Sequence, residues 1–108
     1  MSLSTHVLDT AVGRPAAGVP VLLQRQVRTF DGVPTGWLEA AAATTDDDGR
    51  VRDLPADRAG TWRLVFDTSQ RSGFYPEVVV TFVVTDPDEH LHVPLLLAPY
   101  GYATYRGS

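Results

Sequence analysis

Three histidines, His6, His90 and His92, are the side chains of this sequence best suited to move protons near neutral pH. The unperturbed imidazole pKa of about 6.5 lets histidine act as a general acid or a general base at physiological pH. The sequence has no cysteine, so neither a disulfide nor a thiolate nucleophile is available. The chemistry to consider is therefore proton transfer or metal binding by imidazole.

The spacing of residues 90–97 predicts the surroundings of two of these histidines. Successive side chains of a β-strand point to opposite faces of its sheet. One predicted face carries Leu91, Val93, Leu95 and Leu97, and the other carries His90, His92, Pro94 and Leu96. The aliphatic face can build a core. His92 is followed on its own face by apolar residues, a setting that can tune its pKa, whereas His90 follows two acidic residues and is expected at the surface.

Metal binding is the alternative use of the histidines. His90 and His92 are spaced as a chelating pair, and His6 is a conceivable third ligand. No carboxylate or cysteine stands at a matching position, so we predict proton transfer and no metal. The acidic run 46–48 lacks the register of a calcium loop and is predicted to form a solvated turn.

Arg50 is the fourth candidate. It follows Gly49 directly, at the point where a tight turn enters a predicted strand. A guanidinium held at such a place presents a planar fork of donors to a carbonyl group or an anion. Taken alone, the position favours a surface arginine over a functional one.

The C-terminal segment is predicted to form a β-hairpin that returns to the histidine face. Its turn is Pro99-Tyr100-Gly101, and the last residues include Tyr105 and Arg106. An aromatic and cationic end is better suited to docking on the protein than to a loose tail.

The remaining pattern predicts an all-β sandwich of seven or eight strands in one domain, residues 1–108. Predicted strands span residues 5–10, 18–27, 37–45, 51–54, 61–67 and 77–84, followed by the hairpin. Residues 37–45 are ambiguous because four consecutive alanines favour helix, but strong turn boundaries favour a strand. Residues 67–73 are expected to hold one or two helical turns.

Composition limits the kinds of partner that the protein is expected to bind. The net charge of −4 argues against a nucleic-acid binder. The longest apolar stretch, Val93 to Pro99, is too short to span a membrane, and no signal peptide is expected at the N-terminus. With the lack of cysteine, these features predict a cytoplasmic protein. They leave an anionic small-molecule substrate possible, because a local positive pocket can exist on an acidic protein.

Several segments resemble one known family from end to end of the chain. They are Leu3-Ser4-Thr5-His6-Val7-Leu8-Asp9-Thr10, Gly18-Val19-Pro20-Val21, Asp48-Gly49-Arg50, His92-Val93-Pro94-Leu95-Leu96-Leu97 and Tyr105-Arg106-Gly107-Ser108. They are similar to the transthyretin-related proteins, and the last two resemble the signature of the 5-hydroxyisourate hydrolases in that family. The combination of the terminal tetrapeptide with the histidine motifs is highly specific.

The resemblance implies a prealbumin-like sandwich of eight antiparallel strands with one short helix, assembled as a homotetramer made of two dimers. It implies active sites at the dimer–dimer interface and hydrolysis of 5-hydroxyisourate without a cofactor. His6, Arg50 and His92 match the family's catalytic residues. Tyr105, Arg106, Gly107 and Ser108 match residues that complete the substrate pocket.

The alternative implied by the same resemblance is a non-catalytic small-molecule carrier like transthyretin. In the carrier, the positions that match His6, Arg50, His92 and Tyr105 hold lysine, glutamate, threonine and threonine. This chain has the hydrolase residue at all four. Leu91, Ala98 and Ala103 depart from the usual family residues, but none of them replaces a group that transfers protons.

Overall fold

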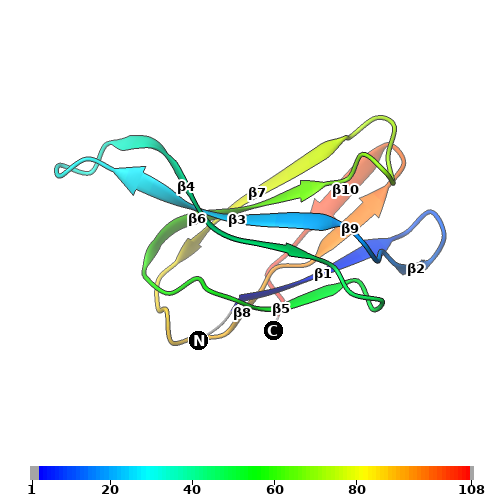
Figure 1. Ribbon diagram of the computed structural model, residues 1–108, viewed down its shortest axis with the longest axis horizontal. Coiled ribbons are helices and arrows are strands. Elements are labelled where there is room, and N and C mark those ends of the chain that lie inside the picture. Colours follow the sequence, from blue (N-terminus) through cyan, green and yellow to red (C-terminus); the bar gives the residue numbers. More distant parts are fainter. Residues whose placement is uncertain (1–2, 108) are drawn as a thin grey trace.

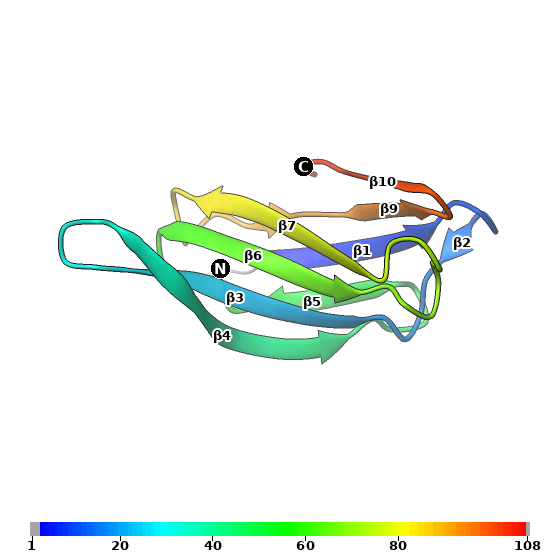
Figure 2. The same cartoon turned by 90° about the horizontal axis from the view of Figure 1, so that it is seen from above.

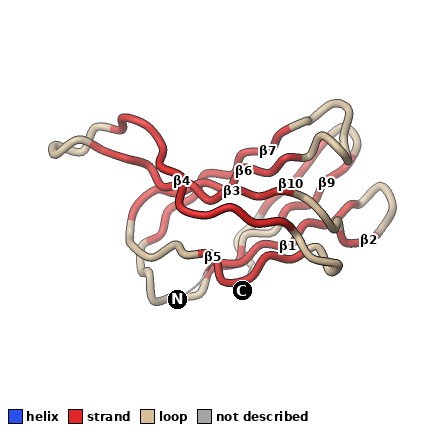
Figure 3. The backbone as a smooth tube through the Cα atoms, viewed as in Figure 1, coloured by secondary structure: helices blue, strands red, loops and turns tan. Residues whose placement is uncertain are grey.

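The computed structural model describes residues 3–107, in which ten strands and no helix are found (Figure 1, Figure 3). The strands are β1 (Leu3–Asp9), β2 (Arg14–Pro15), β3 (Pro20–Arg28), β4 (Pro34–Thr44), β5 (Arg50–Leu54), β6 (Gly60–Asp67), β7 (Glu77–Val84), β8 (Leu91–His92), β9 (Leu95–Ala98) and β10 (Gly101–Thr104). Across these residues no helix is long and apolar enough to cross a membrane.

The strands form two layers, seen edge-on in Figure 2. One sheet has the order β10-β9-β1-β2, with β5 and β8 also paired to β1, and the other has the order β4-β3-β6-β7. The all-β sandwich predicted from the sequence is therefore confirmed. The first sheet is mixed rather than purely antiparallel, because β8 and β9 both run parallel to β1.

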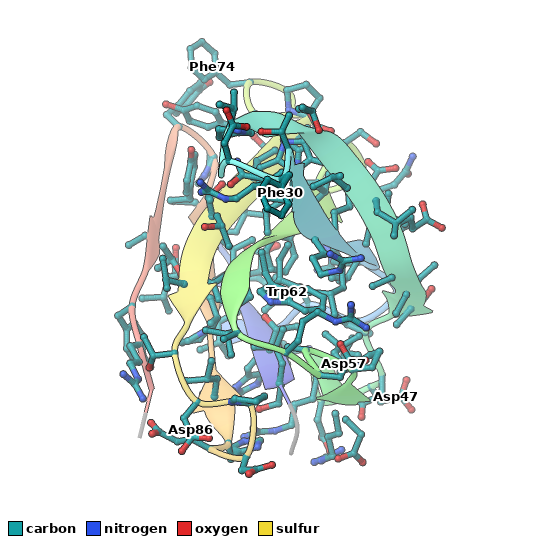
Figure 4. The ribbon with its side chains drawn as sticks, turned by 90° about the vertical axis from the view of Figure 1, so that its left-hand side faces the viewer. Phe30, Asp47, Asp57, Trp62, Phe74 and Asp86 are labelled. Carbon is teal, nitrogen blue, oxygen red and sulfur yellow. The ribbon has the colours of Figure 1, made fainter. Side chains whose placement is uncertain are left out.

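Alternating burial shows which face of each sheet builds the core. In β1 the buried residues Leu3, Thr5 and Val7 alternate with half-buried ones. In β6 Trp62, Leu64 and Phe66 are buried in the same alternating way, and Trp62 lies in the middle of the molecule in Figure 4. The aliphatic set of the C-terminal segment, predicted to face the core, is buried throughout.

The alanine-rich segment is a strand, as predicted, although it begins earlier, at Pro34. It pairs with β3 along its length, and Ala41 and Ala43 pack against the core. Cross-strand hydrogen bonding and burial thus outweigh the helix propensity of alanine. The β3–β4 hairpin extends away from the rest of the sandwich (Figure 1).

The predicted short helix at residues 67–73 is wrong. The backbone N–H groups of Arg71 and Ser72 both donate to the carbonyl of Thr68, which makes a single turn. The Ser72 hydroxyl then accepts hydrogen bonds from the N–H groups of Phe74 and Tyr75. Side-chain bonds of this kind compete with helical ones and end the turn before a helix can propagate.

The predicted strand at residues 90–97 is interrupted, which accounts in part for ten strands instead of eight. His90 precedes β8, and Pro94 separates β8 from β9. Proline has no N–H group to donate to a sheet. The preceding residue stays attached to β1, since the N–H of Val93 donates to the Ser4 carbonyl at 3.0 Å and Thr5 Oγ1 donates to the Val93 carbonyl at 2.6 Å.

Candidate active site

Strand β1 brings the three predicted catalytic residues together. His6 is the register partner of Arg50 in the antiparallel β1–β5 pair, and Ser4 is the partner of His92 in the parallel β1–β8 pair. Ser4 and His6 alternate with the core residues of β1 and therefore lie on the outer face of this sheet. Their neighbours on the flanking strands, Arg50 and His92, are half-buried.

His92 is held by contacts on two sides. Its Nδ1 lies 2.8 Å from the Ser4 hydroxyl oxygen, and its carbonyl accepts a 2.8 Å hydrogen bond from the Gly107 N–H. Burial lowers the pKa of His92, and the positive charges of Arg50, His6 and His90 lower it further, while a hydrogen bond to the Ser4 backbone acts in the opposite direction. The pKa falls below its usual value of 6.5, so the ring is neutral at pH 7 and can accept a proton.

His6 presents a buried nitrogen without a partner. Its Nε2 atom makes no hydrogen bond to any of the described residues. Buried polar atoms in proteins nearly always have a partner. His6 Nε2 is therefore an unsatisfied polar atom close to the candidate site.

The turn before β5 fixes Arg50. The carboxylate of Asp46 accepts hydrogen bonds from the N–H groups of Asp48 and Arg50, and the Arg50 bond is the main reason that the pKa of Asp46 is lowered. Gly49 has a φ of 74° and its carbonyl accepts from the Val7 N–H at 2.7 Å. A Cβ atom at Gly49 would collide with the Val7 carbonyl, so this position requires glycine.

A pocket of about 360 Å³ lies beside these residues. Its lining consists of Ser4, Thr5, Arg50, Arg52, Asp53, His90 and His92. Among the described residues, no group of three His, Asp or Glu side chains is arranged to hold a metal ion. The pocket is rich in hydrogen-bond donors, as binding of a polar, carbonyl-rich molecule requires.

Two features of the pocket were not predicted. Ser4 shares its strand face with His6, so period-two alternation was the signal that could have found it. Arg52 and Asp53 reach the pocket through a β-bulge, because the β1–β5 register shifts between Leu3 and Thr5. Asp53 has a φ of 60°, a left-handed conformation typical of such bulges. No sequence pattern marks this bulge.

The residues of the predicted substrate-binding tail lie in two different places. Tyr105 and Arg106 line a second, largely apolar hollow of about 220 Å³ together with residues of β7. Arg106 also forms an ion pair with Glu89. Gly107 instead packs on the active site, since a Cβ atom there would lie 2.5 Å from Cδ2 of His92. Ser108 lies outside the described residues.

Comparison with known proteins connects this geometry to one family. The model of the HIUase/Transthyretin family matches residues 3–107. The chain belongs to this family. It is 46% identical over 118 residues to the 5-hydroxyisourate hydrolase of Caulobacter vibrioides, covering 98% of this chain and 97% of the relative.

The solved structures similar to this chain include a 5-hydroxyisourate hydrolase and a transthyretin. The 5-hydroxyisourate hydrolase of Klebsiella pneumoniae superposes with a TM-score of 0.79 at 34% identity, covering 99% of this chain and 98% of the other. Sea bream transthyretin in complex with thyroxine superposes with a TM-score of 0.82 at 29% identity, covering 99% and 95%. The backbone fold therefore does not distinguish hydrolase from carrier, and the side chains of the site must.

Proposed function

We propose that this protein hydrolyses 5-hydroxyisourate in urate degradation, opening a ring of the substrate by attack of water on a carbonyl carbon. The observation that carries the proposal is the placement of His6, Arg50 and His92 on adjacent strands around β1, beside a polar pocket. Full-length similarity to curated 5-hydroxyisourate hydrolases supports the same assignment. No cofactor takes part in the proposed reaction.

Imidazole supplies the proton transfers. His92 is neutral at pH 7 because its pKa is lowered, and His6, the register partner of Arg50, has a ring nitrogen with no hydrogen-bond partner among the described residues. The two rings share two tasks, which are activation of the attacking water and return of a proton to the nitrogen that leaves when the C–N bond breaks. General acid–base help of this kind contributes ~10²–10⁴-fold to a rate.

Arg50 supplies the positive charge. Its guanidinium lines the pocket, where its donors polarise the carbonyl under attack and stabilise the oxyanion of the tetrahedral intermediate. Loss of one oxyanion donor typically costs about 3 kcal/mol of transition-state stabilisation. The tight turn at Gly49 is well suited to this role because it leaves the Arg50 backbone little freedom.

We further propose a homotetramer with active sites at the dimer–dimer interface. Among residues 3–107, β7 and β10 each pair with a single strand and form sheet edges, and residues 80–83 and 104–106 line one common hollow. Free edges are ready to pair with a second copy. On the outer face, Leu8 is the register partner of Leu96, which is the partner of Ala103. This apolar row beside His6 is suited to burial against a second dimer.

The test is the decay of freshly generated 5-hydroxyisourate, followed by ultraviolet absorbance. His6→Ala, Arg50→Ala and His92→Ala should each lower kcat/KM by about 10²-fold or more. Arg58→Ala is the matched control, because Arg58 is an exposed arginine paired with Asp57, and it should leave the rate unchanged. An inactive wild-type protein that binds thyroxine would contradict the proposal and favour a carrier.

Removal of residues 105–108 tests the tail. We expect a folded protein with a strongly reduced rate, because Gly107 packs on His92 and donates to its carbonyl. Circular dichroism reports whether the shortened protein folds, and the absorbance assay reports its rate, so a loss of activity can be distinguished from a loss of folding. An unchanged rate would exclude the tail from the site.

A further inference from the structure

Ser4 connects two histidine rings at the edge of the pocket. Its hydroxyl oxygen lies 2.8 Å from Nδ1 of His92 and 3.2 Å from Nε2 of His90. A hydroxyl group has one proton to donate and lone pairs with which to accept. It therefore donates to one ring and accepts from the other, and the three side chains form a continuous chain of hydrogen bonds.

The two ends of this chain lie in different surroundings. His92 is half-buried beside Arg50, whereas the side chain of His90 is exposed. Strand pairing fixes the inner end, since Ser4 is the register partner of His92 and its carbonyl accepts from the Val93 N–H at 3.0 Å. The hydrogen bonds thus lead from the candidate active site to the protein surface.

The relay requires one direction of these hydrogen bonds. We assign the hydrogen of His92 to Nδ1, because this nitrogen lies 2.8 Å from the Ser4 hydroxyl oxygen, which can accept it. Nε2 of His92 is then left with the lone pair that a base needs. In this arrangement Ser4 accepts from His92 and donates to Nε2 of His90.

Hydrolysis of a cyclic amide creates a need for such a path. One proton of the attacking water ends on the leaving nitrogen. The new carboxylic acid loses the other, because carboxyl groups ionise with a pKa near 4. Each turnover at neutral pH therefore releases one proton, which has to leave the site.

We propose that Ser4 and His90 form a proton relay that carries this proton from His92 to solvent. The inference rests on the proposed function. Nε2 of His92 takes the proton, Nδ1 passes its own proton to the Ser4 oxygen, and the Ser4 hydroxyl proton moves to Nε2 of His90. His90 then carries a proton on both nitrogens and releases one to water. His90 returns to its starting state by losing a proton to solvent, and the Ser4 hydroxyl rotates back. His92 regains its starting tautomer when water in the emptied pocket takes the hydrogen from Nε2 and supplies one to Nδ1.

Other ionisable groups surround the relay. The pKa of His92 is lowered by burial and by the positive charges of Arg50, His6 and His90. The pocket is also lined by Arg52 and Asp53. Because arginine remains protonated, neither Arg50 nor Arg52 can accept the proton. In this proposal Ser4 and His90 act through His92, since the Ser4 hydroxyl lies against both rings, so we call them relay and positioning groups.

His90→Ala tests the outer end of the relay. We expect kcat to fall on the order of tenfold, less than for loss of a direct acid or base, while KM changes little. Added imidazole should restore kcat in proportion to its concentration, because it replaces the missing acceptor. Asp88→Asn, a change at an exposed neighbour, serves as the control and should show neither the loss nor the rescue.

Ser4→Ala tests the link between the rings. We expect a similar loss of kcat, and Ser4→Thr, which keeps the hydroxyl, should recover most of it. Ser69→Ala removes an exposed serine hydroxyl bonded to Asp67 and should have no effect. Equal rates for Ser4→Ala and wild type, or a loss in His90→Ala that imidazole does not rescue, would overturn the relay.

A measurement without substrate separates the relay from the proposed function. Ring ¹⁵N NMR at pH 7 should show His92 protonated on Nδ1 in the wild type and a mixture of tautomers in Ser4→Ala. Nε2 protonation of His92 in the wild type would contradict the relay even if the enzyme is active. An inactive wild type would overturn the proposed function and with it the role of the relay in turnover.

Discussion

His92 combines a lowered pKa with a fixed position, and both properties belong to its neighbours. Burial and the nearby positive charges keep the ring neutral, while Ser4 and Gly107 hold it in place. A neutral imidazole held in a fixed position is the form of histidine that can activate water as a general base.

The pH dependence follows from the direction of this pKa shift. A base must be neutral, so kcat/KM should fall as the pH drops through the pKa of His92, and this acid limb should lie below pH 6.5, the usual value. Arg50→Gln removes a positive charge that lowers the pKa, so the limb should move to higher pH. NMR titration of the ring in both proteins checks the shift independently of the lower rate. An Arg50→Gln protein with an unshifted His92 titration would contradict this electrostatic coupling.

Gly107→Ala tests the contact between the tail and His92. The added methyl group would lie 2.5 Å from Cδ2 of the ring, so the ring must move. Displacement of a catalytic group by about 1 Å can cost on the order of 100-fold in rate, and we expect a 10- to 100-fold lower kcat/KM. Gly101→Ala is the control, because no atom lies within 4 Å of its added methyl group. A lower melting temperature with unchanged kcat/KM in Gly107→Ala would indicate a purely structural role.

The individual residues of the site were partly predictable. Residue type and alternation singled out His92, and the turn before β5 singled out Arg50, although the sequence alone did not bring them together. Family resemblance supplied His6 as a partner. Ser4 was missed because serine has no unusual chemistry until two imidazoles approach its hydroxyl.

At the scale of elements, the bulge in β5 shapes the pocket. The alternation of buried and exposed side chains fails in β5. Val51 and Leu54 are both buried, and the two residues between them, Arg52 and Asp53, are both exposed. The bulge residue Asp53 takes a left-handed conformation, which asparagine and aspartate tolerate better than other non-glycine residues. Bulges recur next to active sites, where they redirect side chains.

Substitution of Asp53 separates conformation from charge. Asp53→Val should destabilise the fold by about 1–2 kcal/mol, because a β-branched residue is strained at positive φ. Asp53→Asn removes the charge but tolerates the conformation, and its free energy of unfolding should stay within about 0.5 kcal/mol of wild type. Urea denaturation of both variants makes the comparison. Equal stability of the two would show that the left-handed backbone carries no strain.

The local sequence pattern predicted the strands and their core faces better than it predicted which strands pair in the sheets. Core faces followed from the alternation of Leu91 to Leu97 and of Trp62 to Phe66, where burial and sequence agree. The parallel pairing of β8 and β9 with β1 joins residues more than eighty positions apart, and no local signal encodes such contacts. The single turn at Thr68 resembled a helix because capping residues mark turns and helices alike.

At the scale of the whole molecule, the proposed tetramer would connect activity with assembly through the outer face of the first sheet. The row formed by Leu8, Leu96 and Ala103 crosses three strands beside His6. His6 Nε2 is buried yet has no partner among the described residues of this chain. A second dimer on this face would bury the row and enclose the pocket. The sequence predicted the proposed assembly only through family resemblance, because the symmetry of an oligomer leaves no periodic pattern in one chain.

Leu96→Glu therefore tests assembly and activity together. A carboxylate at the centre of the row would have to be buried without a partner at the dimer–dimer contact, which costs far more than its exposure on a free surface. We expect tetramers to dissociate into dimers, seen by size-exclusion chromatography with light scattering, and kcat/KM to fall with them. Val33→Glu is the matched control, since Val33 is 52% exposed in the β3–β4 loop. If Leu96→Glu stays tetrameric and fully active, the outer face is not the dimer–dimer contact and the pocket must function without it.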